Sequence, residues 1–243
     1  MHTLDECWRS CQADNHYERR IFACNDVCYN GRMTLQYPKQ KRRRRPGSTE
    51  VRLEDFDVTT VFDLFEKKQP FEMEIGSGKG RFLLERAAKH PERNFLGIDY
   101  AWRFLREGHA RIEPRGLDNL RFYKAEASEV VKYLIPDASV DVFHIYFPDP
   151  WPKRQQRKRR LLTPEFFQLL HQRLVPGGKL ELATDNFEYL IFFKKALVYA
   201  GDTLWRDVRE SQDERILDPE ILTHFEAKYR REGRVLYYIE LTK

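Results

Sequence analysis

The chain has 243 residues, 43 of them Lys or Arg and 38 Asp or Glu, giving a formal net charge of +5, and this length fits one α/β domain with appendages. Hydrophobic residues make up 41% and aromatic residues 14%, enough for a packed core, whereas no stretch approaches the roughly 18 apolar residues of a membrane span. The first residues lack a signal-peptide pattern, so we expect a soluble, cytoplasmic protein and no membrane association.

All cysteines lie near the start of the chain. They form two pairs with a spacing of four: Cys7 with Cys11, and Cys24 with Cys28. On helices each pair would share one face, so a helical hairpin closed by two disulfides and a four-thiolate zinc site are both geometrically possible. The small number of core residues in this segment favours a disordered extension instead.

A basic run follows at residues 39–45, K-Q-K-R-R-R-R. Blocks of like charge favour a polyanion, most often nucleic acid, but a solvated tail or a targeting address explains this run equally well. We divide the chain into a disordered extension at 1–49 and a folded domain at 50–243. Met33 offers an alternative start of the protein.

Apolar runs then alternate with segments of helical periodicity. After a leading segment at 50–68, the patterns predict strands at 70–76, 94–99, 119–124, 140–147, 179–183, 203–208 and 235–241. They predict helices at 81–89, 101–112, 128–134, 164–174 and 186–199. This alternation predicts a doubly wound, mostly parallel Rossmann-like sheet with helices on both faces.

A glycine-rich loop joins the first strand to its helix. Residues 74–80 read E-I-G-S-G-K-G, and such glycines let the backbone pass close under a nucleotide-like ligand at a helix amino end. The loop lacks the first glycine and the final Ser or Thr of a Walker loop, and its third glycine comes one residue too early for a dinucleotide loop. Glu74 would repel a pyrophosphate but suits the ammonium and sulfonium of S-adenosylmethionine. We therefore expect Glu74, Gly76 and Gly78 to bind this cofactor.

Two further acids follow predicted strands. Asp99 ends the second strand, where an acidic side chain accepts hydrogen bonds from both ribose hydroxyls of NAD or of S-adenosylmethionine. Glu126 follows the third strand and can close the adenine edge of the same crevice. A surface acid at a helix start explains Glu126 equally well.

The most informative motif is F-P-D-P-W-P-K at residues 147–153. It ends the fourth strand, and Pro148 and Pro150 fix φ and remove N–H donors. We expect Asp149 to project from the carboxyl end of this strand, where open α/β sheets bind their ligands. The alternative is a proline-rich loop with an ordinary aspartate.

A second basic run follows this motif. Residues 153–160 read K-R-Q-Q-R-K-R-R and contain no acid. Beside the candidate active site, the run indicates nucleic-acid binding through phosphates, and a solvated tail or a targeting address explains it less well than it explains the first run. The expected phosphate contacts are Lys153, Arg154, Arg157, Lys158, Arg159 and Arg160.

The ordered set E-I-G-S-G-K-G, G-I-D, F-P-D-P-W-P-K, A-T-D and T-H-F-E resembles the tRNA (guanine-N7)-methyltransferases over about residues 71–243. F-P-D-P-W followed by a basic stretch is the most specific part. The resemblance implies a class I methyltransferase fold, S-adenosylmethionine as methyl donor, and N7 of guanosine 46 in the tRNA variable loop as acceptor. We expect a monomer or a homodimer with tRNA as its partner.

The same resemblance implies roles for individual residues. Glu74, Asp99 and Glu126 correspond to the cofactor-binding acids, although the family usually has Asp at the position of Glu126. Asp149 becomes the catalytic and cofactor-side carboxylate. The implied substrate-binding residues are Lys153, Asp185, Thr223, His224, Phe225 and Glu226. Thr223 and Glu226 also have the spacing of a helix capping box.

The implied reaction needs no strong base. N7 of guanine bears a lone pair at neutral pH, so catalysis would depend on alignment and on Asp149 offsetting the positive charge that develops on the purine. The seven histidines show no ligand spacing, and we expect no metal. Two rival functions are a non-catalytic RNA-binding subunit with a degenerate methyltransferase fold and an oxidoreductase-like Rossmann protein. The joint presence of Glu74, Asp99 and Asp149 argues against degeneracy.

Overall fold

The computed structural model describes residues 52–53, 59–201 and 203–243. The two cysteine pairs, the basic run at 39–45 and the proposed boundary at residue 50 lie outside the described residues. Within them, none of the helices combines the length and the apolar character that crossing a bilayer requires.

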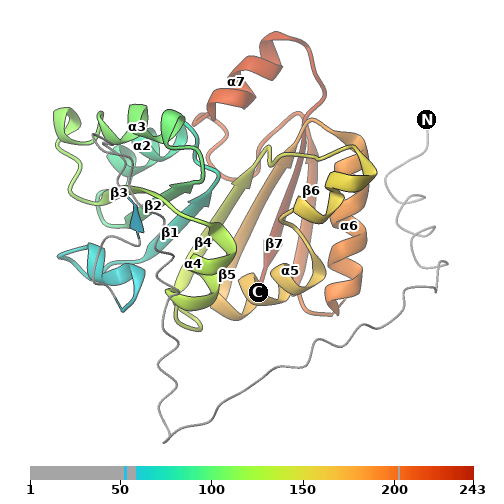
Figure 1. Cartoon of the computed structure of the whole chain (residues 1–243), viewed down its shortest axis with the longest axis horizontal. Coiled ribbons are helices and arrows are strands. Elements are labelled where there is room, and N and C mark those ends of the chain that lie inside the picture. The colour runs from blue at the N-terminus through green and yellow to red at the C-terminus, as the bar shows by residue number, and fades with distance from the viewer. Residues whose placement is uncertain (1–51, 54–58, 202) are drawn as a thin grey trace, which may run out of the picture. The chain divides into compact units, whose positions relative to one another are not determined.

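The described residues form one mixed sheet with the strand order β3-β2-β1-β4-β5-β7-β6. Strands β1 to β5 pair in parallel, and β7 is antiparallel to both β5 and β6. The strands are β1 (Phe71–Ile75), β2 (Asn94–Asp99), β3 (Leu120–Lys124), β4 (Val140–Tyr146), β5 (Leu174–Thr184), β6 (Asp207–Gln212) and β7 (Tyr237–Thr242). The predicted Rossmann-like, mostly parallel sheet is thus confirmed (Figure 1).

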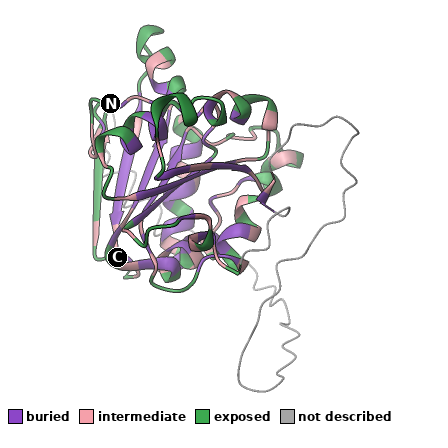
Figure 2. Cartoon of the chain, turned by 90° about the vertical axis from the view of Figure 1, so that its left-hand side faces the viewer, coloured by how far each residue is buried: buried purple, intermediate pink, exposed green. Residues whose placement is uncertain are grey.

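Helices pack on both faces of this sheet, as predicted. One buried cluster joins α4 (Ala127–Tyr133), α5 (Pro164–Arg173) and α6 (Phe187–Gly201) to one face. A second cluster joins α2 (Arg81–Lys89) and α3 (Trp102–His109) to the other face. Figure 2 shows the buried strands between helices whose outward sides are exposed. The core is divided into two clusters because successive side chains of a strand, as in β1, point to opposite faces of the sheet.

Short helices complete the described fold. They are the 3-10 helices η2 (Val61–Leu64), η3 (Glu113–Arg115) and η4 (Arg154–Arg159), and the α-helix α7 (His224–Arg231). Figure 1 shows α7 above the sheet, at the end opposite the C-terminus.

Several predicted bounds differ from the observed ones, and strand β5 begins at Leu174 rather than at residue 179. The strand predicted at 203–208 is β6, Asp207–Gln212; it is a mostly exposed edge strand with polar side chains, so an apolar pattern cannot locate it. The helix predicted at 101–112 ends at His109, and η3 with its Pro114 follows. Helix α7 was expected only through its cap, because Glu226 is its single buried residue and the helix carries no apolar stripe.

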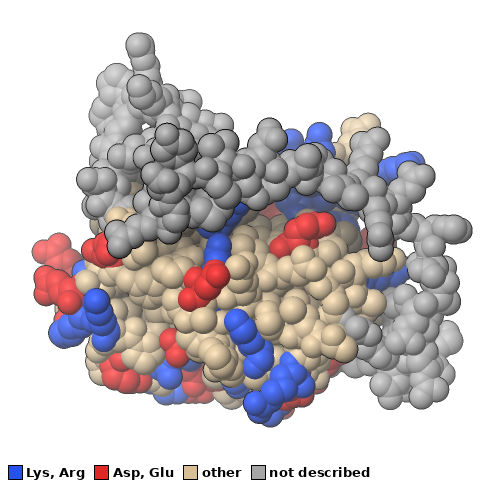
Figure 3. Space-filling model, turned by 90° about the horizontal axis from the view of Figure 1, so that it is seen from below, with Lys and Arg blue, Asp and Glu red and all other residues tan. Residues whose placement is uncertain are grey.

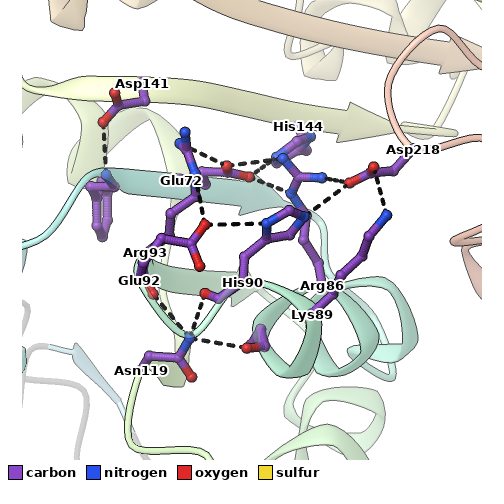
Figure 4. Close-up of polar contacts among 12 residues, drawn as sticks. Glu72, Arg86, Lys89, His90, Glu92, Arg93, Asn119, Asp141, His144 and Asp218 are labelled. Atoms are coloured by element: carbon purple, nitrogen blue, oxygen red, sulfur yellow. Dashed lines mark hydrogen bonds and ion pairs between the residues drawn. The ribbon is translucent and has the colours of Figure 1, made fainter.

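A buried polar network ties α2 to β1 and β4 on the face that carries α2 (Figure 4). The carboxylate of Glu72 is fully buried and accepts hydrogen bonds from Nη2 of Arg86 and from Nε2 of His144, each at 2.9 Å. The Tyr146 hydroxyl donates to Nδ1 of His144 at 2.9 Å, and Arg86 also pairs with Asp218. The network therefore fastens the loop around Asp218 to the sheet.

This network predicts a loss of stability in acid. Burial lowers the pKa of His144 to about 4. Burial alone would raise the pKa of Glu72, but the hydrogen bonds from His144 and Arg86 outweigh it and lower that pKa to about 2. Both groups contribute stability at neutral pH. The contribution of His144 is lost as the pH falls from about 6.5 through 4, and that of Glu72 as the pH falls from about 4.5 through 2.

The test compares His144→Gln with the wild type in urea unfolding between pH 7 and 4. The unfolding midpoint of the wild type should fall more steeply across this range, because glutamine keeps a donor toward Glu72 but does not titrate. Parallel curves for the two proteins would contradict the role of His144.

Candidate active site

A cleft of about 810 Å³ opens at the carboxyl ends of the parallel strands. Its walls come from the segments 74–79, 98–104, 125–127 and 146–149, with Thr223, His224 and Phe225 closing one side. These segments follow β1, β2, β3 and β4 in turn, and the last three residues begin α7. The volume lies in the range of pockets for small molecules and cofactors.

The glycine loop leaves open space on the cleft side. Gly76 has φ +82° and Gly78 has φ +52°, both in the left-handed region, and an added Cβ at either position would meet nothing within 4 Å. A hydrogen bond to β2 fixes the loop, because the amide of Gly76 donates to the carbonyl of Ile98 at 2.8 Å. A ligand can therefore lie close against its backbone.

Glu74 is a buried acid whose second carboxylate oxygen lacks a partner. Its side chain is only 3% exposed, and among the described residues Oε2 has no hydrogen-bond partner. Burial raises the pKa of Glu74 to about 8, with Arg215 lowering it and Asp99 raising it. An unpaired buried acid at the cleft fits the ammonium of S-adenosylmethionine, because a cationic partner would satisfy it.

Asp99 is oriented by the backbone. Its Oδ2 accepts from the amide of Gly78 at 2.9 Å, and its Oδ1 accepts from the amide of Ala101 at 2.7 Å. Burial raises the pKa of Asp99, these two hydrogen bonds lower it, and the charge of Asp149 raises it. Each carboxylate oxygen can accept a further hydrogen bond, so Asp99 suits a ribose diol.

Glu126 lies at the third side of the cleft, just before α4. Its side chain is exposed and makes no capping hydrogen bond to the helix. Its Oε1 accepts a long hydrogen bond, from Ser128 Oγ at 3.4 Å. The carboxylate therefore has the freedom to meet an adenine edge.

Asp149 is exposed at the cleft on a backbone held at both ends. Phe147 and Trp151 have φ of +52° and +42°, a conformation that costs non-glycine residues energy and persists only where the surroundings enforce it. The amide of Phe147 donates to the carbonyl of Ala183 at 2.8 Å, and Nε of Arg160 donates to the carbonyl of Pro150 at 2.8 Å. Asp149 thus projects from the carboxyl end of β4, as predicted.

Arg160 does not belong to the phosphate-binding surface. Its side chain is buried, with its guanidinium carbon 4.4 Å from the ring centroid of Phe192. The expectation that it contacts RNA phosphate is wrong: it supports the loop that carries Asp149. The five other cations of the run are exposed. Nothing in the sequence distinguishes Arg160 from its basic neighbours, because its burial depends on distant aromatic residues.

Glu226 also differs from the expectation. Its carboxylate is fully buried and accepts from the amide of Thr223 at 3.2 Å, while its own amide donates to Thr223 Oγ1 at 3.0 Å. This is the capping box that the spacing also predicted, and Glu226 is not among the residues that line the cleft. Glu226 therefore cannot touch guanine without leaving its cap. Its role is to hold the amino end of α7.

Two other expected substrate residues lie outside the cleft. Asp185 follows β5 and accepts from Nη1 of Arg234 at 2.8 Å. Lys153 is exposed at the start of η4. Both remain accessible to a large substrate that extends beyond the cleft.

Sequence reasoning missed part of the rim. Tyr100 is 61% exposed, and it lines the cleft together with Phe104. Phe225 is 46% exposed and stacks on Tyr229 at 5.7 Å between ring centroids. Arg81 and Lys228 add positive charge at the same rim. Exposed aromatic and basic side chains are suited to binding nucleobases and phosphates.

The sheet order, the open glycine loop and the unpaired acid before its first glycine define a class I methyltransferase. A family model described as a putative methyltransferase matches residues 68–239. A tRNA (guanine-N(7)-)-methyltransferase of Rubrobacter xylanophilus is 33% identical over 182 residues, 74% of this chain and 80% of the relative. One of Lactobacillus gasseri is 38% identical over 183 residues, 72% and 81% of the two chains. The chain therefore belongs to the tRNA (guanine-N7)-methyltransferase family.

A solved antibiotic-related methyltransferase supports the fold alone. It superimposes with a TM-score of 0.52 at 18% sequence identity, over 74% of this chain and 90% of the other.

The exposed run on η4 predicts a salt-dependent affinity for tRNA. Replacing Lys153, Arg157 and Lys158 together by alanine should reduce the slope of log K against log salt by about 0.7 to 0.9 per lost phosphate contact. Filter binding at several salt concentrations measures the slope. An unchanged slope would contradict phosphate binding by this run.

The matched control is the pair Lys67→Ala and Lys68→Ala. Both lysines are exposed and precede β1, at the opposite end of the strands. Figure 3 views that end, where visible basic and acidic side chains are interspersed. This variant should keep the slope of the wild type.

Proposed function

We propose that this protein transfers the methyl group of S-adenosylmethionine to N7 of guanosine 46 in the variable loop of tRNA, in the cytoplasm. The observation that carries the proposal is the position of Asp149, held by its proline-flanked loop at the same cleft as the unpaired Glu74. The named relatives support the reaction. The resemblance of the sequence to the family supplies position 46.

The acids of the cleft would contact three parts of the cofactor. Glu74 would bind the ammonium, Asp99 the ribose hydroxyls and Glu126 the adenine edge. S-adenosylmethionine, when bound, supplies an electrophilic methyl group on a sulfonium. The open backbone at Gly76 and Gly78 leaves room for the cofactor beside the strand ends.

Asp149 has a positional and electrostatic role. Guanine N7 has a lone pair at neutral pH, so no proton has to be removed before it attacks and no side chain has to act as a base. Asp149 would orient the purine and stabilise the positive charge that develops on it. The strained residues Phe147 and Trp151 fix the backbone that carries Asp149, which reduces the reorganisation needed during the reaction.

The start of α7 would receive the guanine from the other side. Thr223 and His224 line the cleft, and Phe225 adds an exposed ring that a base can stack on. The exposed cations of η4 would bind phosphates of the same tRNA. Phosphate contacts orient a nucleic acid without reading its sequence, so recognition of the guanine falls to the cleft.

The test incubates purified protein with unmodified tRNA and tritiated S-adenosylmethionine, followed by chemical cleavage at N7-methylguanosine. The proposal predicts cleavage at position 46. Binding of tRNA without methyl transfer would indicate a non-catalytic RNA-binding subunit. Binding of NAD would indicate an oxidoreductase.

A further inference from the structure

Arg215 is a buried cation directly behind the wall of the cleft. It comes from a segment whose preceding residue is exposed, yet its own side chain is inaccessible to solvent. Its guanidinium carbon lies 4.9 Å from the ring centroid of Phe82 and 4.3 Å from that of Tyr146. Both rings line the cleft, whereas Arg215 does not. Arg215 therefore supports these two walls from below.

On the substrate side, Arg215 holds the start of α7. Its Nη2 pairs with the carboxylate of Glu226, and both side chains are fully buried. Glu226 in turn fixes Thr223 through the capping box, and Thr223 lines the cleft. The chain of contacts runs from Arg215 through Glu226 to the first residues of α7.

On the cofactor side, Arg215 packs on Tyr146 of β4, the strand that pairs with β1 beside Glu74. Its Nε and Nη1 have no hydrogen-bond partner within the described part of the chain, and the same holds for Oε2 of Glu74. The positive charge of Arg215 is close enough to lower the pKa of Glu74. A buried donor and a buried acceptor without partners are costly to stability, so stability alone does not explain the two groups.

We propose that Arg215 is a positioning residue for both halves of the active site: it anchors α7 through Glu226 and keeps the carboxylate of Glu74 available to the ammonium of the cofactor. This inference rests on the proposed function, since that function supplies the cofactor and the tRNA. The inference adds Arg215, a residue that contacts neither the cofactor nor the tRNA.

A purely structural role, neutralising Glu226, does not account for the arrangement. Glu226 already accepts from Nη2 of Arg230 at 3.2 Å and from the Tyr238 hydroxyl at 2.7 Å. Arg215 has two further donors beyond this pair. The other titratable groups whose charge interacts with Arg215 are His144 and Tyr146 of β4, Glu181 of β5, Tyr238 of β7 and Arg230 of α7.

The first test measures the affinity for S-adenosylhomocysteine by calorimetry between pH 6 and 9, without tRNA. The ammonium of the ligand needs an ionised Glu74, whose pKa is about 8 in the free protein. Affinity should therefore rise about tenfold per pH unit below pH 8 and level off above it. Arg215→Met removes the charge that lowers this pKa, so the rise should move to higher pH. Affinity at pH 7 should fall about tenfold for each unit of pKa shift.

Arg230→Met is the matched control. Arg230 pairs with the same carboxylate, but from the solvent side, with a side chain 37% exposed. This variant should keep the pH profile of the wild type, and Arg215→Lys should restore part of it. Identical profiles for Arg215→Met and Arg230→Met would overturn the proposal.

A second variant guards against misfolding. Arg215→Met leaves Glu226 as a buried, partly unpaired charge, whereas Arg215→Met with Glu226→Gln replaces the ion pair by neutral groups, which proteins often tolerate. Compared with Glu226→Gln alone, the double variant should still show the pH shift. Equal profiles for these two proteins would also overturn the proposal.

The second test measures KM for tRNA at saturating cofactor and pH 8.5. Arg215→Met should raise KM several-fold over Arg230→Met, because the start of α7 loses its anchor. An equal KM would refute the contribution to α7. A wild-type chain that binds S-adenosylhomocysteine without methylating tRNA would refute the proposed function. The pH profiles would still test whether Arg215 keeps the carboxylate of Glu74 available to the ammonium of the ligand. No S-adenosylhomocysteine binding by the wild type would overturn both.

Discussion

Asp149→Asn is expected to lower the single-turnover rate of methyl transfer to tRNA about 10²- to 10³-fold, the range found when one preorganised electrostatic group is removed from an active site. Asparagine keeps the shape of the side chain but cannot offset the positive charge that develops on guanine. The strained backbone at Phe147 and Trp151 should hold asparagine in the same place. The loss should therefore reflect charge rather than position.

Cofactor binding separates this interpretation from general damage. The affinity for S-adenosylhomocysteine should change much less than the rate, because Glu74 and Asp99 remain in place. Asp118→Asn is a suitable control: Asp118 is exposed, pairs with Lys67 at 2.8 Å and precedes β3, at the opposite end of the strands. It should react at the wild-type rate. A normal rate for Asp149→Asn would remove Asp149 from the mechanism.

Glu74→Gln is expected to weaken cofactor binding about 100-fold, or about 2.7 kcal/mol. Truncating one partner of a buried charge pair typically costs 2–5 kcal/mol of binding free energy. Glutamine has nearly the same volume, so the cleft and its glycine loop should persist. Isothermal calorimetry with S-adenosylhomocysteine at pH 8.5 measures the effect, since Glu74 is largely ionised there.

The same substitution has an opposite effect on stability. Because burial raises the pKa of Glu74 to about 8, the folded protein holds this proton more tightly than the unfolded chain does. The contribution of Glu74 to the free energy of unfolding should therefore decrease as the pH rises from about 4.5 to 8. Glu74→Gln lacks this decrease, so its urea midpoint should improve relative to the wild type across that range. Unchanged affinity, or a constant difference in midpoint, would contradict the role of Glu74.

The sequence predicted the elements and residues whose signals are local. Strand β2 and helix α2 were predicted with their observed bounds, because each has a clear apolar pattern between turn residues. Asp149 was placed correctly because two prolines restrict its loop regardless of the rest of the fold. Glu226 was predicted as a cap for the same reason, since a capping box is a contact over three residues.

The remaining features depend on tertiary contacts. Arg160 was expected to contact phosphate, and no sequence signal pointed to Arg215, yet each is buried against aromatic rings from other elements. Strand β6 is mostly exposed, so its position follows from pairing with β7 rather than from its own side chains. That Glu74 is buried without a full set of partners also emerges only when the sheet, α2 and Arg215 come together.

The most direct measurement of the central claim uses two tRNA transcripts that differ in one atom. One carries guanosine at position 46 and the other 7-deazaguanosine, which has carbon in place of N7. Both are incubated with the protein and tritiated S-adenosylmethionine. The account predicts label in the first transcript and none above background in the second. Equal labelling of the two would contradict it.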